Sequence, residues 1–262
     1  MKKFLKQIIS LAPDKIYAIM LTSRFIFNRE KITVKSEENF LLVKDSETPW
    51  WTHRKRVHLY SQGLASRGES IGKSYLLSYI PFKRGDVVID CGANMGDLLL
   101  YFKNREIDVN YFGLEPNPID YKCLQRNCSA THSALNLALW NKSTSLTFFV
   151  DTDSASSSLI EPPTFTEKVS VNCARLDDLV FPEKIKLFKV EGEGAEPEIL
   201  EGARGMFRRI EYISVDAGPE RGIQQTPTKN DVLKVLENSN FELVMENPYH
   251  RKTMLFRNSA FK

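Results

Sequence analysis

The sequence has little cysteine and little histidine, four of each among 262 residues, and no two cysteines stand in a Cys-x-x-Cys pair. The common zinc sites and the disulfide frameworks of small secreted domains both depend on such clusters, so the sequence predicts no metal and no disulfide. Free cysteines are typical of a reducing compartment, and we therefore expect a cytoplasmic protein.

Long apolar runs and a strong excess of one charge are also missing. Polar residues interrupt the basic segment 1–12, and the apolar run 16–27 is broken and too short to cross a membrane. A helix that packs on the domain is the favoured interpretation of the N-terminus, with weak contact of a basic amphipathic helix with a membrane surface as the alternative. The net charge of +3, with scattered lysines and arginines, indicates a small-molecule or glycan partner and no nucleic acid.

A third absence concerns glycine. The β-branched run 87–89 reads as a buried strand that ends on Asp90 and enters a turn with Gly92 and Gly96. Strand, glycine turn and helix together are how doubly wound proteins hold a nucleotide-like ligand, because glycine lets the backbone approach it. The spacing here is Gly-x-x-x-Gly, without the extra glycine that admits a pyrophosphate. We therefore expect a ligand without phosphates, and S-adenosylmethionine is the common one.

Strand and helix patterns alternate from Asp86 onward, which predicts an α/β domain with a mostly parallel sheet. Only residues 246–253 separate the last two predicted strands, and a parallel crossover needs about a dozen residues, so these two strands must be antiparallel. The predicted strands are 87–90, 111–115, 136–139, 187–190, 210–216, 241–245 and 254–256, with an extra pair at 146–150 and 169–174. The predicted helices are 97–103, 118–128, 197–204 and 229–239.

Four blocks stand out in this pattern: Asp-Val-Val-Ile-Asp-Cys-Gly-Ala-Asn-Met-Gly at 86–96, Gly-Leu-Glu-Pro-Asn at 113–117, Asn-Leu-Ala-Leu-Trp at 136–140, and Lys-Val-Glu-Gly-Glu-Gly-Ala-Glu-Pro-Glu-Ile-Leu-Glu-Gly-Ala at 189–203. In this order they resemble the motifs of the FkbM family of S-adenosylmethionine-dependent methyltransferases. The chain departs from the family pattern at Glu191, where the family usually has aspartate, and at Gly192, where it has an apolar residue.

The resemblance implies a Rossmann-like class I methyltransferase fold in residues 81–262. Its sheet is expected to be seven-stranded and mostly parallel, closed by the antiparallel C-terminal hairpin. Residues 1–80 lie outside the match and are predicted to form a helical N-terminal extension or cap, with a short strand at 40–43 as its one strand. Within it, residues 50–58 combine tryptophan, histidine and arginine, which can recognise a sugar or an anionic acceptor. A cap helix that packs its tryptophans inward is the slightly preferred interpretation.

The predicted cofactor site lies at the ends of the first three parallel strands. Asp90 is expected to receive the methionine ammonium, and N–H groups of the turn its carboxylate, with a purely structural turn as the alternative. Glu115 suits the ribose hydroxyls, or caps the next helix, and Ala138 leaves room for adenine. The full predicted set is Asp90, Gly92, Ala93, Asn94, Gly96, Glu115, Pro116, Asn117, Asn136, Ala138 and Glu193.

Glu191, which follows the fourth strand, is the first candidate for the group that orients or deprotonates an acceptor hydroxyl. Asp216, at the end of the fifth strand, and His250, in the final hairpin turn, are the weaker catalytic candidates. Three further acidic residues of the 189–203 block are interpreted as a solvated helix start favoured by the helix dipole: Glu196, Glu198 and Glu201.

The resemblance implies methyl transfer to an oxygen, commonly a hydroxyl of a sugar, glycan or natural product. The transfer would be a direct in-line displacement that depends mainly on positioning. Two alternatives stay open: a nucleotide-dependent oxidoreductase, against which the missing glycine and the hairpin argue, and a non-catalytic S-adenosylmethionine-binding module.

Overall fold

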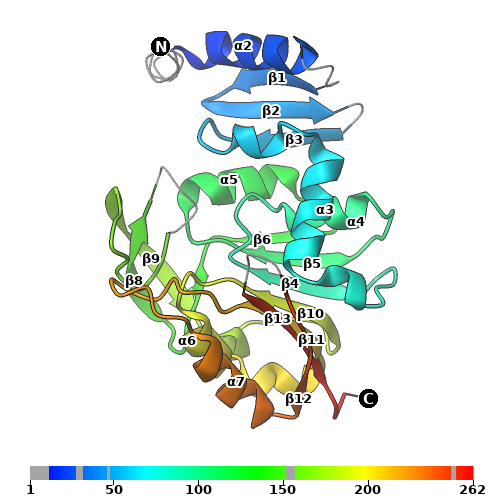
Figure 1. Ribbon diagram of the computed structural model, residues 1–262, viewed down its shortest axis with the longest axis vertical. Coiled ribbons are helices and arrows are strands. Elements are labelled where there is room, and N and C mark those ends of the chain that lie inside the picture. The colour runs from blue at the N-terminus through cyan, green and yellow to red at the C-terminus, as the bar shows by residue number, and fades with distance from the viewer. Residues whose placement is uncertain (1–11, 28–31, 46–47, 152–156, 249–251, 262) are drawn as a thin grey trace.

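A seven-stranded sheet forms the centre of the computed structural model, which describes residues 12–27, 32–45, 48–151, 157–248 and 252–261 (Figure 1). The strand order is β12-β13-β11-β10-β4-β5-β6. Neighbours from β11 to β6 are parallel, whereas β13 is antiparallel to both β11 and β12, which confirms the predicted closing hairpin. The bounds are β4 Val87–Cys91, β5 Asn110–Leu114, β6 Ser133–Leu135, β10 Ile185–Val190, β11 Ile210–Asp216, β12 Phe241–Glu246 and β13 Thr253–Asn258.

Helices cover both faces of this sheet, with α3, α4 and α5 on one side and α6 and α7 on the other (Figure 1). Side chains alternate along each strand, so neighbouring positions enter different cores: Val88 packs toward the first group of helices and Ile89 toward the second. Asn117 begins α5 by accepting hydrogen bonds from two backbone N–H groups, and Pro118 occupies the first turn. The bounds are α3 Leu64–Ser74, α4 Leu98–Lys103, α5 Pro118–Asn127, α6 Glu196–Glu201 and α7 Lys229–Glu237, with short 3-10 segments at Val57–Tyr60, Leu77–Tyr79, Leu176–Asp178 and Arg204–Arg209.

The strand predicted at 136–139 is divided between two sheets. Ser133–Leu135 joins the central sheet as β6, and Ala138–Leu139 forms β7 of a small sheet in the order β7-β9-β8. The division falls at Asn136, whose side-chain amide donates to the carbonyls of Glu115 and Pro116 and so ends the pairing with β5. The extra pair of strands was predicted correctly, with β8 at Thr144–Val150 and β9 at Glu167–Ala174, and the structure shows that the two are antiparallel.

The N-terminal layer, residues 12–75, contains helices and the strand predicted at 40–43, but this strand belongs to a three-stranded sheet that we did not predict. After α2 (Asp14–Phe27), three antiparallel strands follow: β1 Ile32–Glu37, β2 Phe40–Asp45 and β3 Thr48–Thr52. Glu38 and Asn39 both have positive φ, 48° and 68°, which suits a tight hairpin between β1 and β2. The two tryptophans therefore lie on strand β3, and no cap helix carries them.

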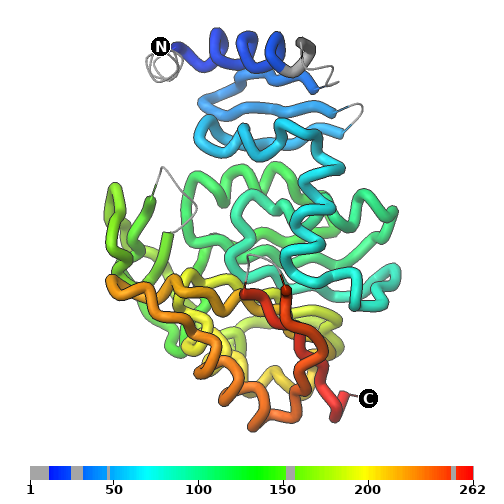
Figure 2. The backbone as a smooth tube through the Cα atoms, viewed as in Figure 1, coloured from blue at the N-terminus to red at the C-terminus, as the bar shows by residue number. Residues whose placement is uncertain are grey.

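Helix α2 and strands β1, β2 and β3 of the N-terminal layer lie at the opposite end of the molecule from the C-terminus, whereas α3 runs from there along the central domain (Figure 2). Trp50 is fully buried in a core that also contains Leu98 of α4 and Leu124 of α5. Burial of this aromatic ring attaches the layer to the part of the domain that carries the glycine turn. No helix in the described part of the chain is long and apolar enough to cross a membrane.

Candidate cofactor and active site

A cavity of about 330 Å³ opens where β4, β5 and β10 reach their carboxyl ends. This is the edge at which open α/β sheets bind ligands, and the volume is near the lower end of the roughly 300–1,000 Å³ typical of ligand sites. Three segments supply the sheet side of the wall: 91–94, 114–117 and 189–193. The N-terminal layer supplies a second part, and Phe148, Ser157 and Leu159 a third.

The glycine turn after β4 is tightly closed. Gly92 has a φ of +69°, and a Cβ placed there would lie 2.3 Å from the carbonyl oxygen of Glu191, so only glycine fits. The N–H groups of Gly92 and Ala93 both donate to the Leu114 carbonyl at 3.0 Å, and the N–H of Asn94 donates to Glu115 at 2.7 Å. These three N–H groups are thus engaged by Leu114 and Glu115, and their expected role in receiving the methionine carboxylate stays a prediction.

Asp90 lies beneath the turn and does not line the cavity. It is 1% exposed, accepts a hydrogen bond from the Tyr111 hydroxyl at 2.7 Å and pairs with the Lys189 ammonium at 3.0 Å. A carboxylate this deep needs a countercharge, and Lys189 supplies it from the neighbouring strand. This placement does not support direct contact of Asp90 with a cofactor ammonium. Gly96 is also behind the wall, against Leu124.

Lys189 is the residue that the sequence analysis missed. Besides Asp90, its ammonium contacts the carbonyls of Cys91 and Gly92, at 3.0 and 2.9 Å, and the carboxylate of Glu191 at 3.1 Å. Burial alone lowers the pKa of this lysine, but Asp90, Tyr75 and Glu191 together more than compensate and hold the pKa well above its ordinary value. Lys189 is thus a buried cation that connects β4, the glycine turn and Glu191. The available signal was a lysine between the apolar Phe188 and Val190 of a central strand.

Glu115 stands on the cavity wall at the end of β5, as predicted. One carboxylate oxygen accepts the N–H of Asn94 at 2.7 Å, and the other accepts the N–H of Asn117 at 2.8 Å. Burial raises its pKa to about 8, with a further contribution from the neighbouring Asp120. Pro116, Asn117 and Ala138 also line the cavity, whereas the exposed Asn136 does not.

The loop after β10 brings two acidic side chains to the cavity, Glu191 and Glu193. Its shape depends on Glu196, which is completely buried, accepts the N–H groups of Gly192 and Gly194 at 2.9 and 3.0 Å, and accepts the Thr228 hydroxyl at 2.9 Å. Interpreting Glu196 as part of a solvated helix start was wrong, because the helix turns this side chain inward under the loop. Of the same group, Glu198 pairs with Arg221 and Glu201 with Arg204.

Asp216, one of the two weaker catalytic candidates, does not reach the wall. Asp216 ends β11 as predicted, but it is 3% exposed and is not among the lining residues. The β11 end is covered by the antiparallel β13, where Thr253 pairs with Asp216. His250 lies outside the described residues. Of the predicted catalytic residues that the structure describes, Glu191 lies on the cavity and Asp216 does not.

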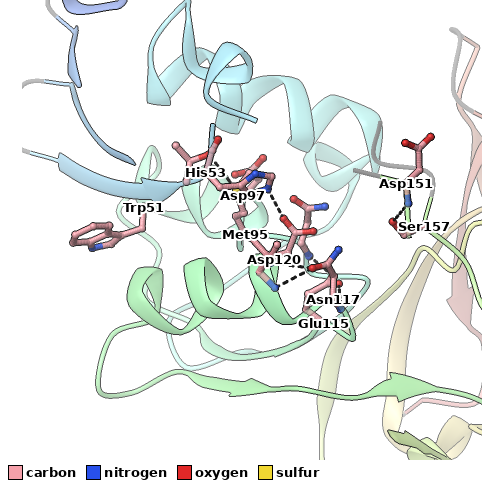
Figure 3. A network of polar contacts seen from close by, with 12 residues as sticks. Trp51, His53, Met95, Asp97, Glu115, Asn117, Asp120, Asp151 and Ser157 are labelled. Carbon is pink, nitrogen blue, oxygen red and sulfur yellow. Dashed lines mark hydrogen bonds and ion pairs between the residues drawn. The ribbon is translucent and has the colours of Figure 1, made fainter. Parts of the chain in front are cut away.

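A polar network attaches the N-terminal layer to the glycine turn (Figure 3). Asp97, just after the turn, accepts hydrogen bonds from Tyr60 at 2.7 Å and from Arg67 at 2.7 Å. His53 reaches Asp120 at 2.9 Å, at the start of α5. Asp97 and Asp120 both line the cavity, so residues of the N-terminal layer hold two acidic side chains of the site in place.

The sheet order, the closing hairpin and the cavity at the strand ends define a class I methyltransferase fold. Residues 90–243 match the family model for the methyltransferase FkbM domain. The chain therefore belongs to the FkbM family of methyltransferases, and S-adenosylmethionine is its cofactor. This membership excludes the oxidoreductase alternative.

Known relatives are distant. Methyltransferase 1 of Beauveria bassiana (strain ARSEF 2860) is 24% identical over 196 residues, which cover 64% of this chain and 77% of that protein. The solved methyltransferase FkbM from Methylobacillus flagellatus KT is 17% identical with a TM-score of 0.47, over 69% of this chain and 45% of that one, so this chain spans less than half of its length. TrmK of M. capricolum, solved with S-adenosylhomocysteine, is 10% identical with a TM-score of 0.40, over 76% and 68% of the two chains.

The charge of the cavity fits this cofactor, which carries a sulfonium and an ammonium. Opposite charges attract strongly where water is excluded, so an acidic wall suits a cationic ligand. Glu115 and Ala138 stand where a ribose and an adenine are expected in this fold. Acidic side chains outnumber basic ones on the wall: Asp97, Glu115, Asp120, Glu191 and Glu193 against Arg56, Arg67 and Lys189.

Proposed function

We propose that this methyltransferase acts on a hydroxyl oxygen of a sugar, glycan or natural product. The observation that carries the proposal is Glu191, a carboxylate on the cavity wall that Lys189 anchors at 3.1 Å. A positioned carboxylate can hold a hydroxyl by accepting its hydrogen bond and can take its proton as the oxygen becomes bonded to carbon. An amine acceptor would not need such a base once its nitrogen is neutral.

When bound, S-adenosylmethionine supplies a methyl group that its sulfonium has already activated. Glu191 would accept the hydrogen bond of the acceptor hydroxyl, take its proton as the oxygen receives the methyl group, and then release that proton to water. The contribution of this chain is mainly position: Glu191 orients the oxygen, and the buried Lys189 holds the carboxylate of Glu191 in place.

For the cofactor itself, we assign the ribose hydroxyls to Glu115 and the methionine ammonium to Glu193. Glu193 replaces Asp90 in this role because it lines the cavity, whereas Asp90 is buried against Lys189. Glu193 has a φ of 49°, and its carbonyl accepts the Ser158 hydroxyl at 2.8 Å, so a second segment fixes this part of the loop.

The test is a methyl-transfer assay with ¹³C-methyl-labelled cofactor on a panel of glycosides and polyols, each paired with its amino analogue. We expect the label on oxygen in the NMR spectrum of the product. Glu191→Gln should lower kcat by about 10²–10⁴, as for loss of a general base, with little change in the S-adenosylhomocysteine Kd. Glu193→Gln should instead weaken S-adenosylhomocysteine binding. Label on nitrogen, or unchanged turnover in Glu191→Gln, would overturn the proposal.

A further inference from the structure

The part of the cavity wall that comes from the N-terminal layer has no role in the chemistry described so far. It consists of Arg56, Leu59, Arg67, Ile71 and Tyr75. Two of these are arginines and three are largely apolar. This is the composition of a surface that binds an organic molecule with a negatively charged group.

The three cations of the cavity differ in one respect. Arg67 is neutralised by Asp97, with its nitrogens 2.7 and 2.6 Å from one carboxylate oxygen. Lys189 is neutralised by Asp90 and Glu191. The guanidinium of Arg56 has no hydrogen bond and no ion pair with any residue that the structure describes. Arg56 is therefore the cavity cation whose donors are available to a ligand.

The backbone that carries Arg56 is fixed. Its N–H donates to the His53 carbonyl at 2.9 Å, and its carbonyl accepts the N–H of Leu59 at 2.9 Å. The next residue, Val57, is fully buried. Upstream, the ring of His53 is held by Asp120. A guanidinium keeps its charge at all physiological pH values, so this site holds a permanent, half-buried positive charge on a rigid segment.

The neighbouring Arg54 differs from Arg56, because its guanidinium is engaged by other residues of the N-terminal layer. Its guanidinium donates to the Ala12 carbonyl at 2.6 Å and to Asp14 at 3.0 Å, and it lies over the ring of Tyr17. Arg54 thus connects β3 to α2 and does not line the cavity. Of the two arginines, only Arg56 is directed to the site.

We propose that Arg56 binds a carboxylate or phosphate group of the acceptor, so that the substrate is an acidic or phosphorylated sugar. The inference rests on the proposed function, because it takes the acceptor to share the cavity with the cofactor. Arginine meets both anions with paired N–H donors, and Leu59 and Ile71 provide apolar contact beside it. The methionine carboxylate of the cofactor is the competing anion, and the experiment separates the two.

The test is calorimetric titration of the protein saturated with S-adenosylhomocysteine. The probes are D-glucuronate and D-glucose 1-phosphate, with methyl β-D-glucoside as the neutral counterpart. We expect at least one anionic probe to bind, and the neutral probe to bind about tenfold more weakly or not at all. Arg56→Gln should weaken the anionic probe by about tenfold or more, as expected for loss of a charge-assisted hydrogen bond, and Arg56→Lys by less.

The matched control is Arg84→Gln, because Arg84 is 86% exposed and precedes β4 at the opposite end of the strand. It should bind the probe like the wild type. Absence of anion binding to the wild type, or equal binding by Arg56→Gln, would overturn the inference. So would a loss of S-adenosylhomocysteine affinity in Arg56→Gln, which would assign the arginine to the cofactor. If neutral sugars are methylated as efficiently as anionic ones, this inference is refuted and the proposed function stays intact.

Discussion

Replacing Lys189 by methionine tests the central claim about the site, that a buried cation connects β4, the glycine turn and Glu191. The substitution keeps most of the side-chain volume but leaves the carboxylate of Asp90 buried with the Tyr111 hydroxyl and no countercharge. Breaking a buried ion pair by removing one partner costs about 3–5 kcal/mol of unfolding free energy. At roughly 2–4 °C per kcal/mol for a chain of this size, Tm should fall by about 6–20 °C.

The measurement is urea and thermal unfolding without cofactor, followed by tryptophan fluorescence. Lys186→Met is the matched control, because Lys186 lies on the same strand and pairs with Glu211 at 2.9 Å nearer the surface. We expect it to cost about 1 kcal/mol or less. Adding Asp90→Asn to Lys189→Met should restore much of the stability, since removing both charges also removes the unpaired one.

The pH dependence of this effect has a definite sign. The folded pKa of Lys189 lies above its ordinary value, so its contribution is fully present below about pH 10.5 and is lost only as pH rises through the folded pKa. Lys189 itself therefore adds no pH dependence below about pH 9. Its removal takes away the charge that lowers the pKa of the buried Asp90, so the stability difference between wild type and Lys189→Met should grow as pH rises toward the raised pKa of the unpaired Asp90. If Lys189→Met costs no more than Lys186→Met, or if the double variant is no more stable than the single one, the ion pair is not what holds the turn.

Three further outcomes follow from the geometry of the site. Gly92→Ala should weaken S-adenosylhomocysteine binding by about tenfold or more in calorimetry, because its Cβ would meet a carbonyl oxygen at 2.3 Å; Gly85→Ala, with a similar φ and open space, should not. The folded pKa of Glu115, about 8, exceeds its ordinary value of 4.5, so the folded state holds a proton that the unfolded state has lost. Stability should thus fall as pH rises from about 4.5 to 8, and urea unfolding of Glu115→Gln should show a smaller slope. Glu196→Ala leaves two loop N–H groups without their acceptor and should lower stability by about 1–3 kcal/mol in urea unfolding, more than Glu201→Ala at the exposed end of the helix.

Much of the central domain was predictable because its signals are local. The β-branched run before Asp90, the glycine spacing after it, and the helix start at Asn117 and Pro118 each depend on residues a few positions apart. The short connection before β13 excluded a parallel crossover, so the antiparallel hairpin followed from chain length alone. Glu115 and Glu191 were placed on the cavity for the same reason, since each directly follows a strand.

The N-terminal layer shows where local patterns were insufficient. The alternation of buried and exposed positions in β1 and β2 extends over only a few residues. The Trp50–Trp51 pair is compatible with a helix or a strand. Burial of Trp50 against α4 and α5 decides in favour of the strand. The same packing separates Arg54 from Arg56, two residues apart in sequence, because one meets α2 and the other the cavity.

The sequence by itself determined the class of fold, the positions of the glycine turn and of the acidic residues at the strand ends, and the resemblance that led to the family. Only the tertiary structure decided which of these groups meet a ligand. Asp90 and Lys189 are 99 positions apart, yet they are direct neighbours because β10 lies beside β4 in the sheet. Because of this pairing, Asp90 is buried as the countercharge of Lys189 and does not reach the cavity. The acidic side chains at the strand ends that do line the cavity are Glu115, Glu191 and Glu193. Strand order is set by how the whole chain buries its apolar surface, and no local pattern encodes it.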